Sequence, residues 1–298
     1  MLEVKNLKKV YGNKVAIHDI TFNVPDGEIV GLIGKNGAGK STILKSIAGL
    51  LTTNGGSITF DGEICGRTTE IVRDFGILIE CAFLDYISAY DNLRLLYNAG
   101  CQDDSESARS VIDTAFDLVG LTAVSNNKVK TYSFGMKQRL GLAQAIINGR
   151  KFIMLDEPFI GLDPPGKEIV KNVLIKKAKE DGCAILFSSH DLDDVAEICD
   201  KVVMISGGTC AYDGPIQKGR TYRVSITDMN CTAASLCSQL KTFAEDIRIS
   251  DGQIIFSIYD NHKTMNKPLS IISQHCSILD ITSEKCNLKN MFAKEYAS

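Results

Sequence analysis

The chain has 298 residues, of which 44% are hydrophobic and 23% are charged, and its formal net charge at pH 7 is −3. These proportions are typical of a globular protein with one large domain and an appendage, and they exclude a general positive field for nucleic acid. Charged residues or glycine interrupt every apolar run before it reaches the roughly 18 residues that a membrane span requires. We therefore expect any membrane role to be exercised through partner chains.

Ten cysteines are scattered through the sequence, and none of them forms a C-x-x-C pair. Several lie within apolar runs, as Cys183 does in the segment 183–187. Such thiols behave as small buried hydrophobic groups, and their number without a disulfide pattern predicts a reducing, cytoplasmic environment. The spacings of known zinc patterns are missing, so we expect no metal held by cysteine.

After an alternating strand at Met1–Leu7, the first fifty residues predict two further strands, a turn and a helix. Alternation over Val15–Val24 predicts a strand, Pro25–Gly27 predicts a turn, and the apolar run Glu28–Ile33 predicts another strand. The segment Thr42–Leu50 has the pattern of a helix. Between the last of these strands and the helix, Gly34–Thr42 fits the phosphate-loop pattern G-x-x-x-x-G-K-[ST] in the context that the pattern requires.

This loop predicts a binding site for a nucleoside triphosphate. The glycines allow the backbone N–H groups to wrap a polyphosphate, and the following helix turns its positive end toward the same anion. We expect Lys40 to reach the β- and γ-phosphates and the Ser41 hydroxyl to bind Mg²⁺. The residues expected to contact the nucleotide here are Gly34, Asn36, Gly37, Gly39, Lys40, Ser41 and Thr42.

Beyond the first helix, the periodicity of the apolar residues changes twice before residue 215. A strand is predicted at Ser57–Phe60, and the helical period dominates from about Ala89 to Ile147. Unalternated apolar runs at Phe152–Leu155 and Ala184–Phe187 then predict strands that are covered on both faces. The predicted fold is thus an α/β nucleotide-binding domain over residues 1–215, with a helical subdomain inserted at about 85–150.

The remainder predicts a second, smaller domain of the α+β class over residues 219–298. Strands are expected at Thr221–Ile226, Gln253–Ile258 and Ile278–Ile281, with a helical segment at Thr232–Ala244 after the first of them. A final amphipathic piece is expected at Leu288–Tyr296.

Polar residues follow two of the predicted core strands. Asp156 ends the run that begins at Phe152, in the position of a second magnesium ligand, and Glu157 after it is placed to polarise an attacking water as a general base. His190 follows the next strand, where an imidazole can contact the γ-phosphate and its attacking water.

Together these segments resemble the nucleotide-binding subunit of ABC transporters over about residues 1–215. Gly34–Thr42 resembles the Walker A motif of that family, and Phe152–Glu157 resembles its Walker B motif with the catalytic glutamate. The resemblance implies that Tyr11 stacks on adenine, that Gly161–Asp163 is the D-loop and that His190 is the switch histidine.

The family's signature motif is matched by Tyr132–Arg139. The resemblance implies that Ser133 and the backbone near Gly135 bind the γ-phosphate held by the Walker A loop of another subunit, so that two ATP molecules are buried in a homodimer. ATP binding would close this dimer, and hydrolysis would open it.

Two departures from the usual family pattern narrow the resemblance. Phe134 and Met136 stand where the usual signature has a glycine and a glutamine, and Glu80 stands where most members have a glutamine that senses magnesium and the membrane subunit. Glu80 with this signature resembles the bacitracin-resistance and lantibiotic-immunity exporters, and Leu288–Phe292 is similar to the closing helix of that group. We expect Glu80 to lie near Mg²⁺, where its carboxylate adds a charge.

The expected function is that of the ATP-hydrolysing subunit of a membrane exporter, with antimicrobial peptides or another drug as cargo. Separately encoded permease subunits would hold it on the inner face of the cell membrane, and no nucleic-acid partner is expected. Two alternatives stay open: a soluble ABC ATPase that acts on ribosomes or DNA, and an importer ATPase. The single cassette, without a sustained heptad run, argues against the first, and Glu80 with the signature argues against the second.

Overall fold

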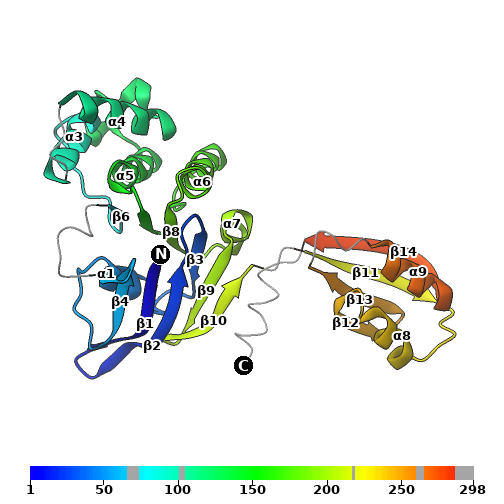
Figure 1. Cartoon of the computed structure of the whole chain (residues 1–298). Helices are drawn as coiled ribbons and strands as arrows, with labels where there is room; N and C mark the ends of the chain where they lie inside the picture. The colour runs from blue at the N-terminus through cyan, green and yellow to red at the C-terminus, as the bar shows by residue number, and fades with distance from the viewer. Residues whose placement is uncertain (66–73, 101–104, 217–218, 260–264, 286–298) are drawn as a thin grey trace. The chain divides into compact units, whose positions relative to one another are not determined.

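The structure is a computed structural model, and it describes residues 1–65, 74–100, 105–216, 219–259 and 265–285 (Figure 1). The chain divides into two compact units, Met1–Pro215 and Ile216–Ser298, and each is described by itself. No helix within the described ranges is both long enough and apolar enough to cross a bilayer.

The first unit begins with a small antiparallel sheet in the strand order β2-β1-β4-β5. Along β2 the side chains alternate between buried and exposed over most of its length, which is the pattern that predicted a strand here. The strands are β1 (Leu2–Tyr11), β2 (Lys14–Val24), β4 (Gly55–Phe60) and β5 (Glu63–Ile64).

The second sheet of this unit positions the site. Its strand order is β10-β9-β3-β8-β7-β6, and all of its neighbouring strands are parallel except the antiparallel pair β9 and β10. All residues of β3 and β8 are buried, as expected for strands covered on both faces. The strands are β3 (Ile29–Ile33), β6 (Phe75–Leu78), β7 (Phe152–Asp156), β8 (Ala184–Ser189), β9 (Lys201–Ser206) and β10 (Thr209–Pro215).

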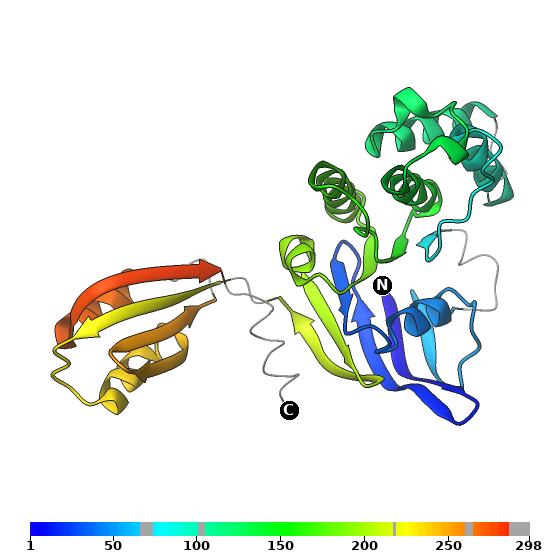
Figure 2. The ribbon, with the colours of Figure 1, turned by 180° about the vertical axis from the view of Figure 1, so that it is seen from behind.

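Helices cover both faces of the parallel sheet (Figures 1 and 2). Helix α1 (Lys40–Ile47) buries Ile43, Leu44 and Ile47 in a core that it shares with residues of both sheets, among them Ile17 and Phe152. Helices α6 (Pro164–Lys179) and α7 (Leu192–Ile198) lie against β3 and β8. The sheet is therefore held rigidly, and its carboxyl ends can present side chains at fixed positions.

A helical insert lies between β6 and β7, as the helical period predicted. Helix α5 packs directly on β6 and also contacts α3 and α4. The elements of the insert are α3 (Ala89–Gly100), α4 (Ser105–Leu118), the short helical turns η1 (Thr122–Val124) and η2 (Val129–Thr131), and α5 (Phe134–Asn148). The predicted α/β class with a helical insert is confirmed.

The second unit is the predicted small α+β fold. Its elements follow the order β-α-β-β-α-β, and its four antiparallel strands lie in the order β12-β13-β11-β14, which is the ferredoxin-like arrangement. Val224, Leu236 and Phe256 are among its fully buried residues. The elements are β11 (Arg220–Thr227), α8 (Ala233–Leu240), β12 (Glu245–Ser250), β13 (Gln253–Ile258), α9 (Asn266–His275) and β14 (Ser277–Lys285).

Two details of this unit bear on the sequence analysis. The helix expected over Thr232–Ala244 is shorter in the structure, because α8 ends at Leu240 and the chain turns toward β12. Thr232 is its N-cap and accepts a hydrogen bond from the Ser235 N–H. The amphipathic piece expected at Leu288–Tyr296 lies outside the described residues.

The close contact between β6 and α5 leads us to predict how a substitution at Gly76 changes the stability of the protein. A Cβ atom on Gly76 would lie 2.0 Å from the carbonyl oxygen of Ala145, so the helix would have to shift. We expect Gly76→Ala to lower the free energy of unfolding by roughly 1–3 kcal/mol in denaturant titration. Gly55→Ala is the control, because its Cβ would meet only the Lys8 Cβ at 3.6 Å. Equal losses for the two variants would show that α5 does not depend on Gly76.

Candidate functional site

The phosphate loop leaves β3 and enters α1 through backbone conformations that favour glycine. Gly37 has φ 80° and Gly39, the N-cap of α1, has φ 114°. Gly34 is required by space instead, since a Cβ there would lie 2.5 Å from the carbonyl oxygen of Ile205. Because Gly39 has no side chain to cap α1, the first N–H groups of the helix stay available for an anion.

Lys40 is the first residue of α1 and is only 6% exposed. Its ammonium donates a hydrogen bond of 2.8 Å to the carbonyl oxygen of Gly34 and lies 3.8 Å from Oε1 of Glu157. A buried ammonium group needs anionic or polar partners nearby. The phosphate of a ligand can replace the Glu157 carboxylate as the partner of Lys40.

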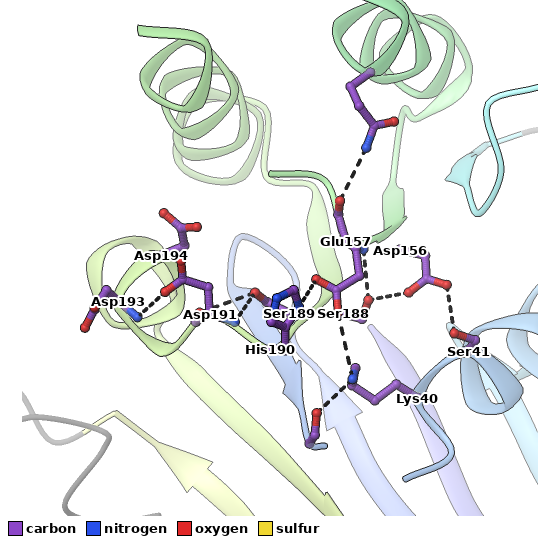
Figure 3. A network of polar contacts seen from close by, with 12 residues as sticks. Lys40, Ser41, Asp156, Glu157, Ser188, Ser189, His190, Asp191, Asp193 and Asp194 are labelled. Atoms are coloured by element: carbon purple, nitrogen blue, oxygen red, sulfur yellow. Dashed lines mark hydrogen bonds and ion pairs between the residues drawn. The ribbon is translucent and has the colours of Figure 1, made fainter. Parts of the chain in front are cut away.

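Ser41 and Asp156 come together although 115 positions separate them in the chain. The Ser41 hydroxyl donates a hydrogen bond of 2.9 Å to Oδ2 of Asp156, which ends β7 (Figure 3). A hydroxyl and a carboxylate beside a phosphate loop are the oxygen donors that Mg²⁺ prefers.

Ser188, which the sequence analysis did not single out, joins the two acidic residues. Its fully buried hydroxyl donates to Oδ1 of Asp156 and accepts a hydrogen bond of 2.9 Å from the backbone N–H of Glu157 (Figure 3). The sequence held a signal for this contact: Asp156 ends β7, Ser188 is the last residue but one of the neighbouring parallel strand β8, and the two lie opposite each other in the register. A hydroxyl at that strand end is therefore next to the carboxylate.

Glu157 adopts a backbone conformation that is unusual for a residue with a side chain, with φ 48°. Its Oε2 atom lies 2.9 Å from Nδ1 of His190, and its Oε1 atom faces Lys40 (Figure 3). The structure thus brings the two predicted catalytic residues into direct contact.

One residue of the helical insert contacts Glu157, and a residue of the loop after β6 contacts that residue in turn. The side-chain amide of Gln138 in α5 donates to the backbone carbonyl of Glu157 at 3.4 Å. The thiol of Cys81 donates in turn to Oε1 of Gln138 at 2.9 Å. These contacts join segments far apart in the chain, and no spacing in the sequence indicates them.

Tyr11 and Glu80 lie at exposed positions. Tyr11 ends β1, is 46% exposed, and has the Lys9 ammonium 5.1 Å from its ring centroid. The side chain of Glu80 is 77% exposed and forms an ion pair of 3.0 Å with Lys45 in the last turn of α1. Of the three residues expected near magnesium, Ser41 and Asp156 contact each other, whereas the Glu80 carboxylate contacts Lys45.

The signature segment is held by its own hydrogen bonds. Ser133 is the N-cap of α5, and its hydroxyl accepts a hydrogen bond of 3.2 Å from the Met136 N–H. Burial raises the pKa of Tyr132 to about 12, and its hydroxyl donates to the carbonyl of Val124 at 2.8 Å.

The start of α5 also packs on the segment Gly161–Asp163. The Phe134 ring lies directly over Gly161, where a Cβ would be 2.3 Å from a ring carbon, and Gly161 has φ 69°. A Cβ on Gly135 would lie 3.3 Å from the carbonyl oxygen of Gly161. Asp163 caps α6 by accepting a hydrogen bond of 3.0 Å from Gly166.

The family model described as "ABC transporter" matches residues 17–160. The ABC transporter ATP-binding protein YdbJ of Bacillus subtilis is 32% identical over 99% of this chain and 94% of its own length. The lantibiotic transport ATP-binding protein SrtF of Streptococcus pyogenes is 38% identical over 72% of this chain and 92% of its own. The bacitracin transport ATP-binding protein BcrA of Bacillus licheniformis is 29% identical over 99% and 96%.

Among solved structures, the dimeric bacterial ABC transporter cassette MJ0796 superposes with a TM-score of 0.68 at 25% identity, over 72% of this chain and 99% of its own. The matched family model and the relatives agree with the phosphate loop and its acidic partners. The chain belongs to the ATP-binding proteins of ABC transporters, and it is an ATPase of that family.

Proposed function

We propose that this chain is the ATP-hydrolysing subunit of an exporter for antimicrobial peptides of the lantibiotic or bacitracin kind, or for another drug. The observation that carries the ATP-hydrolysing part of the proposal is the network that joins Lys40, Ser41, Asp156, Glu157 and His190 through Ser188. The transport names of the relatives SrtF and BcrA support the cargo.

The residues of the phosphate loop fit an ATP–magnesium complex. The glycine conformations, the start of α1 and the Lys40 ammonium offer donors to the phosphates, while Tyr11 is exposed at the end of β1 for stacking on adenine. We assign Mg²⁺ to Ser41 and Asp156, whose oxygen atoms are 2.9 Å apart. When bound, the ion neutralises phosphate charge.

Glu157 has the geometry of a general base. Its carboxylate contacts Lys40 and His190, and its backbone is tied to Ser188. When a phosphate forms the ion pair with the Lys40 ammonium, Oε1 of Glu157 loses that partner. This oxygen can then accept a proton from water. A His190 ring with its proton on Nδ1 then holds the other oxygen in place.

We infer that the working form is a homodimer with two ATP molecules between the chains. Ser133, Gly135 and Asp163 would be the residues that meet the nucleotide of the partner copy. Support comes from their clustering at the start of α5 and α6 and from the dimeric form of the cassette MJ0796. Each phosphate would bridge two chains, so that hydrolysis weakens the dimer.

We further propose that permease subunits hold the dimer on the cytoplasmic face of the cell membrane. A pull-down from detergent-solubilised membranes, with the closed dimer as bait, tests this directly. Recovery of small multi-span proteins would support the exporter, whereas recovery of ribosomes, or of no partner, would favour an ATPase that acts away from membranes. An importer would be indicated by a co-purified extracellular binding protein.

Replacing the proposed base tests the mechanism. We expect Glu157→Gln to keep ATP binding and to lower turnover by about 10²–10⁴-fold, since an amide cannot take the proton from water. The variant should elute as a dimer in size-exclusion chromatography with ATP and as a monomer without it. Glu180→Gln, at the C-cap of α6, is the matched control. Turnover near that of the wild type would mean that Glu157 is not the base.

Ser188→Ala tests the residue that joins the acidic pair. The change leaves the Glu157 N–H and one Asp156 oxygen without their partner, so we expect roughly 1–3 kcal/mol of lost stability and about tenfold slower turnover. Ser46→Ala is the control, because the hydroxyl of Ser46 is also in the first unit but donates, among the described residues, to the carbonyl of Thr42 in its own helix at 2.8 Å. Equal turnover in the two variants would contradict the positioning role.

Glu80→Gln tests the departure from the usual family residue. The variant loses the ion pair with Lys45 but keeps the shape of the side chain. We expect unchanged ATP affinity of the purified chain and reduced peptide resistance of cells that carry the variant, with Glu63→Gln in β5 as the control. Unchanged resistance would remove a special role for Glu80.

A further inference from the structure

Lysines of α6 and acidic residues of α7 and its N-cap form an ionic network around the buried carboxylate of Asp194, and the mechanism above does not use it. We propose that Lys167 is a positioning residue of the ATPase, which ties α6 to α7 and thereby holds His190 against Glu157. The proposal rests on the roles given to Glu157 and His190 under Proposed function, and it adds the residue that keeps them together.

The network is centred on Asp194, whose side chain is only 5% exposed. Its Oδ2 atom lies 2.6 Å from the ammonium of Lys167, and its Oδ1 atom lies 3.0 Å from that of Lys171. Lys167 also contacts Asp191 at 3.4 Å, and Lys171 contacts Glu197 at 2.5 Å. A buried carboxylate needs such partners, so moving α7 away from α6 would cost Asp194 the two ammonium groups that compensate for its burial.

Both helices begin directly after loops that belong to the site. On the α6 side, the Lys167 N–H donates to the carbonyl of Asp163 at 2.9 Å, so that the lysine lies in the first turn after Gly161–Asp163. On the α7 side, Asp191 is the N-cap, and it follows His190 immediately in the chain. One ammonium therefore reaches from the first turn of one helix to the cap of the other.

His190 lies between Ser189 and Asp191, and both of these neighbours have hydrogen bonds of their own (Figure 3). The carboxylate of Asp191 accepts from the Asp193 N–H at 3.0 Å with one oxygen and faces Lys167 with the other. The Asp191 N–H donates to the Ser189 hydroxyl, also at 3.0 Å. With both neighbours fixed, the backbone of His190 has little freedom to carry its ring away from Glu157.

The second lysine extends the network to the segment that follows Glu157. The ammonium of Lys171 lies 5.9 Å from the ring centroid of Phe159, and this ring packs edge-on against Phe187 of β8 at 5.5 Å. A cation over an aromatic ring is attractive, and more so when water is excluded. The network thus reaches the chain on both sides of the contact between Glu157 and His190.

The charge states agree with this geometry. The hydrogen bond to Asp194 is the main reason why the pKa of Lys167 lies above its ordinary value. Burial alone would raise the pKa of Asp191, but the Asp193 N–H and the Lys167 ammonium outweigh it and hold that pKa below its ordinary value. Both groups therefore remain charged around neutral pH.

The test compares Lys167→Met with Lys167→Arg in the purified full chain. We expect Lys167→Met to lower kcat for ATP about tenfold, to change KM less than about twofold, and Lys167→Arg to restore most of the loss. Lys177→Met is the matched control, because Lys177 on the same helix forms an ion pair of 2.8 Å with Asp181 away from the site. It should leave kcat within about twofold of the wild type.

A second background separates positioning from simple helix stabilisation. If Lys167 acts through His190, then Lys167→Met should cause no further loss of kcat when added to His190→Ala, whereas independent effects would multiply. A tenfold loss in that background, or equal kcat for Lys167→Met and Lys177→Met, would overturn the proposal. Wild-type turnover of Glu157→Gln would instead overturn the proposed function itself.

Asp191→Asn decides the matter if Lys167→Met fails to fold. An asparagine keeps the cap of α7 but removes the charge that faces Lys167. We expect this variant to unfold at nearly the wild-type temperature and to lose kcat about threefold or more, again only when His190 is present. Full kcat with an intact fold would contradict the role of the network.

Discussion

The hydrogen bonds that join the ends of β7 and β8 are the constraint on which the rest of the site depends. Asp156 and Ser188 lie opposite each other in a parallel register, so that one hydroxyl can serve a carboxylate and the backbone N–H of Glu157 together. The phosphate loop after β3 meets this pair through Ser41. Rigid packing on both faces of the sheet turns three strand ends into one site.

Sequence reasoning was sufficient wherever the determinants are local. The phosphate loop could be predicted because its glycine conformations and its helix start lie within nine consecutive residues, and the strands could be predicted from unbroken apolar runs. The sequence did not indicate the roles of three residues, Ser188, Gln138 and Cys81, because these roles depend on strand register and on contacts between segments that are remote in the chain. The length of α8 was overestimated, since the residues that follow it also fit a helical pattern.

The carboxylate of Glu80 has two possible partners, the Lys45 ammonium and a magnesium ion. The sequence places it where the family has a residue that senses magnesium, and in the structure its carboxylate lies 3.0 Å from Lys45. An exposed ion pair of this kind is weak, about 0–1 kcal/mol, so a stronger positive charge nearby can displace it. The assignment of Glu80 to magnesium therefore stays a prediction, with Lys45 as the group that competes for the same carboxylate.

The packing of Phe134 on Gly161 restricts the order in which these two positions can change during evolution. Any side chain at residue 161 would collide with the ring and would also have to adopt φ 69°. A side chain in this loop therefore costs less once the aromatic ring has been lost, because otherwise the exposed Phe134 must turn aside to make room. The reverse path is open, because a chain that begins with small residues at both positions can acquire the ring in a single step.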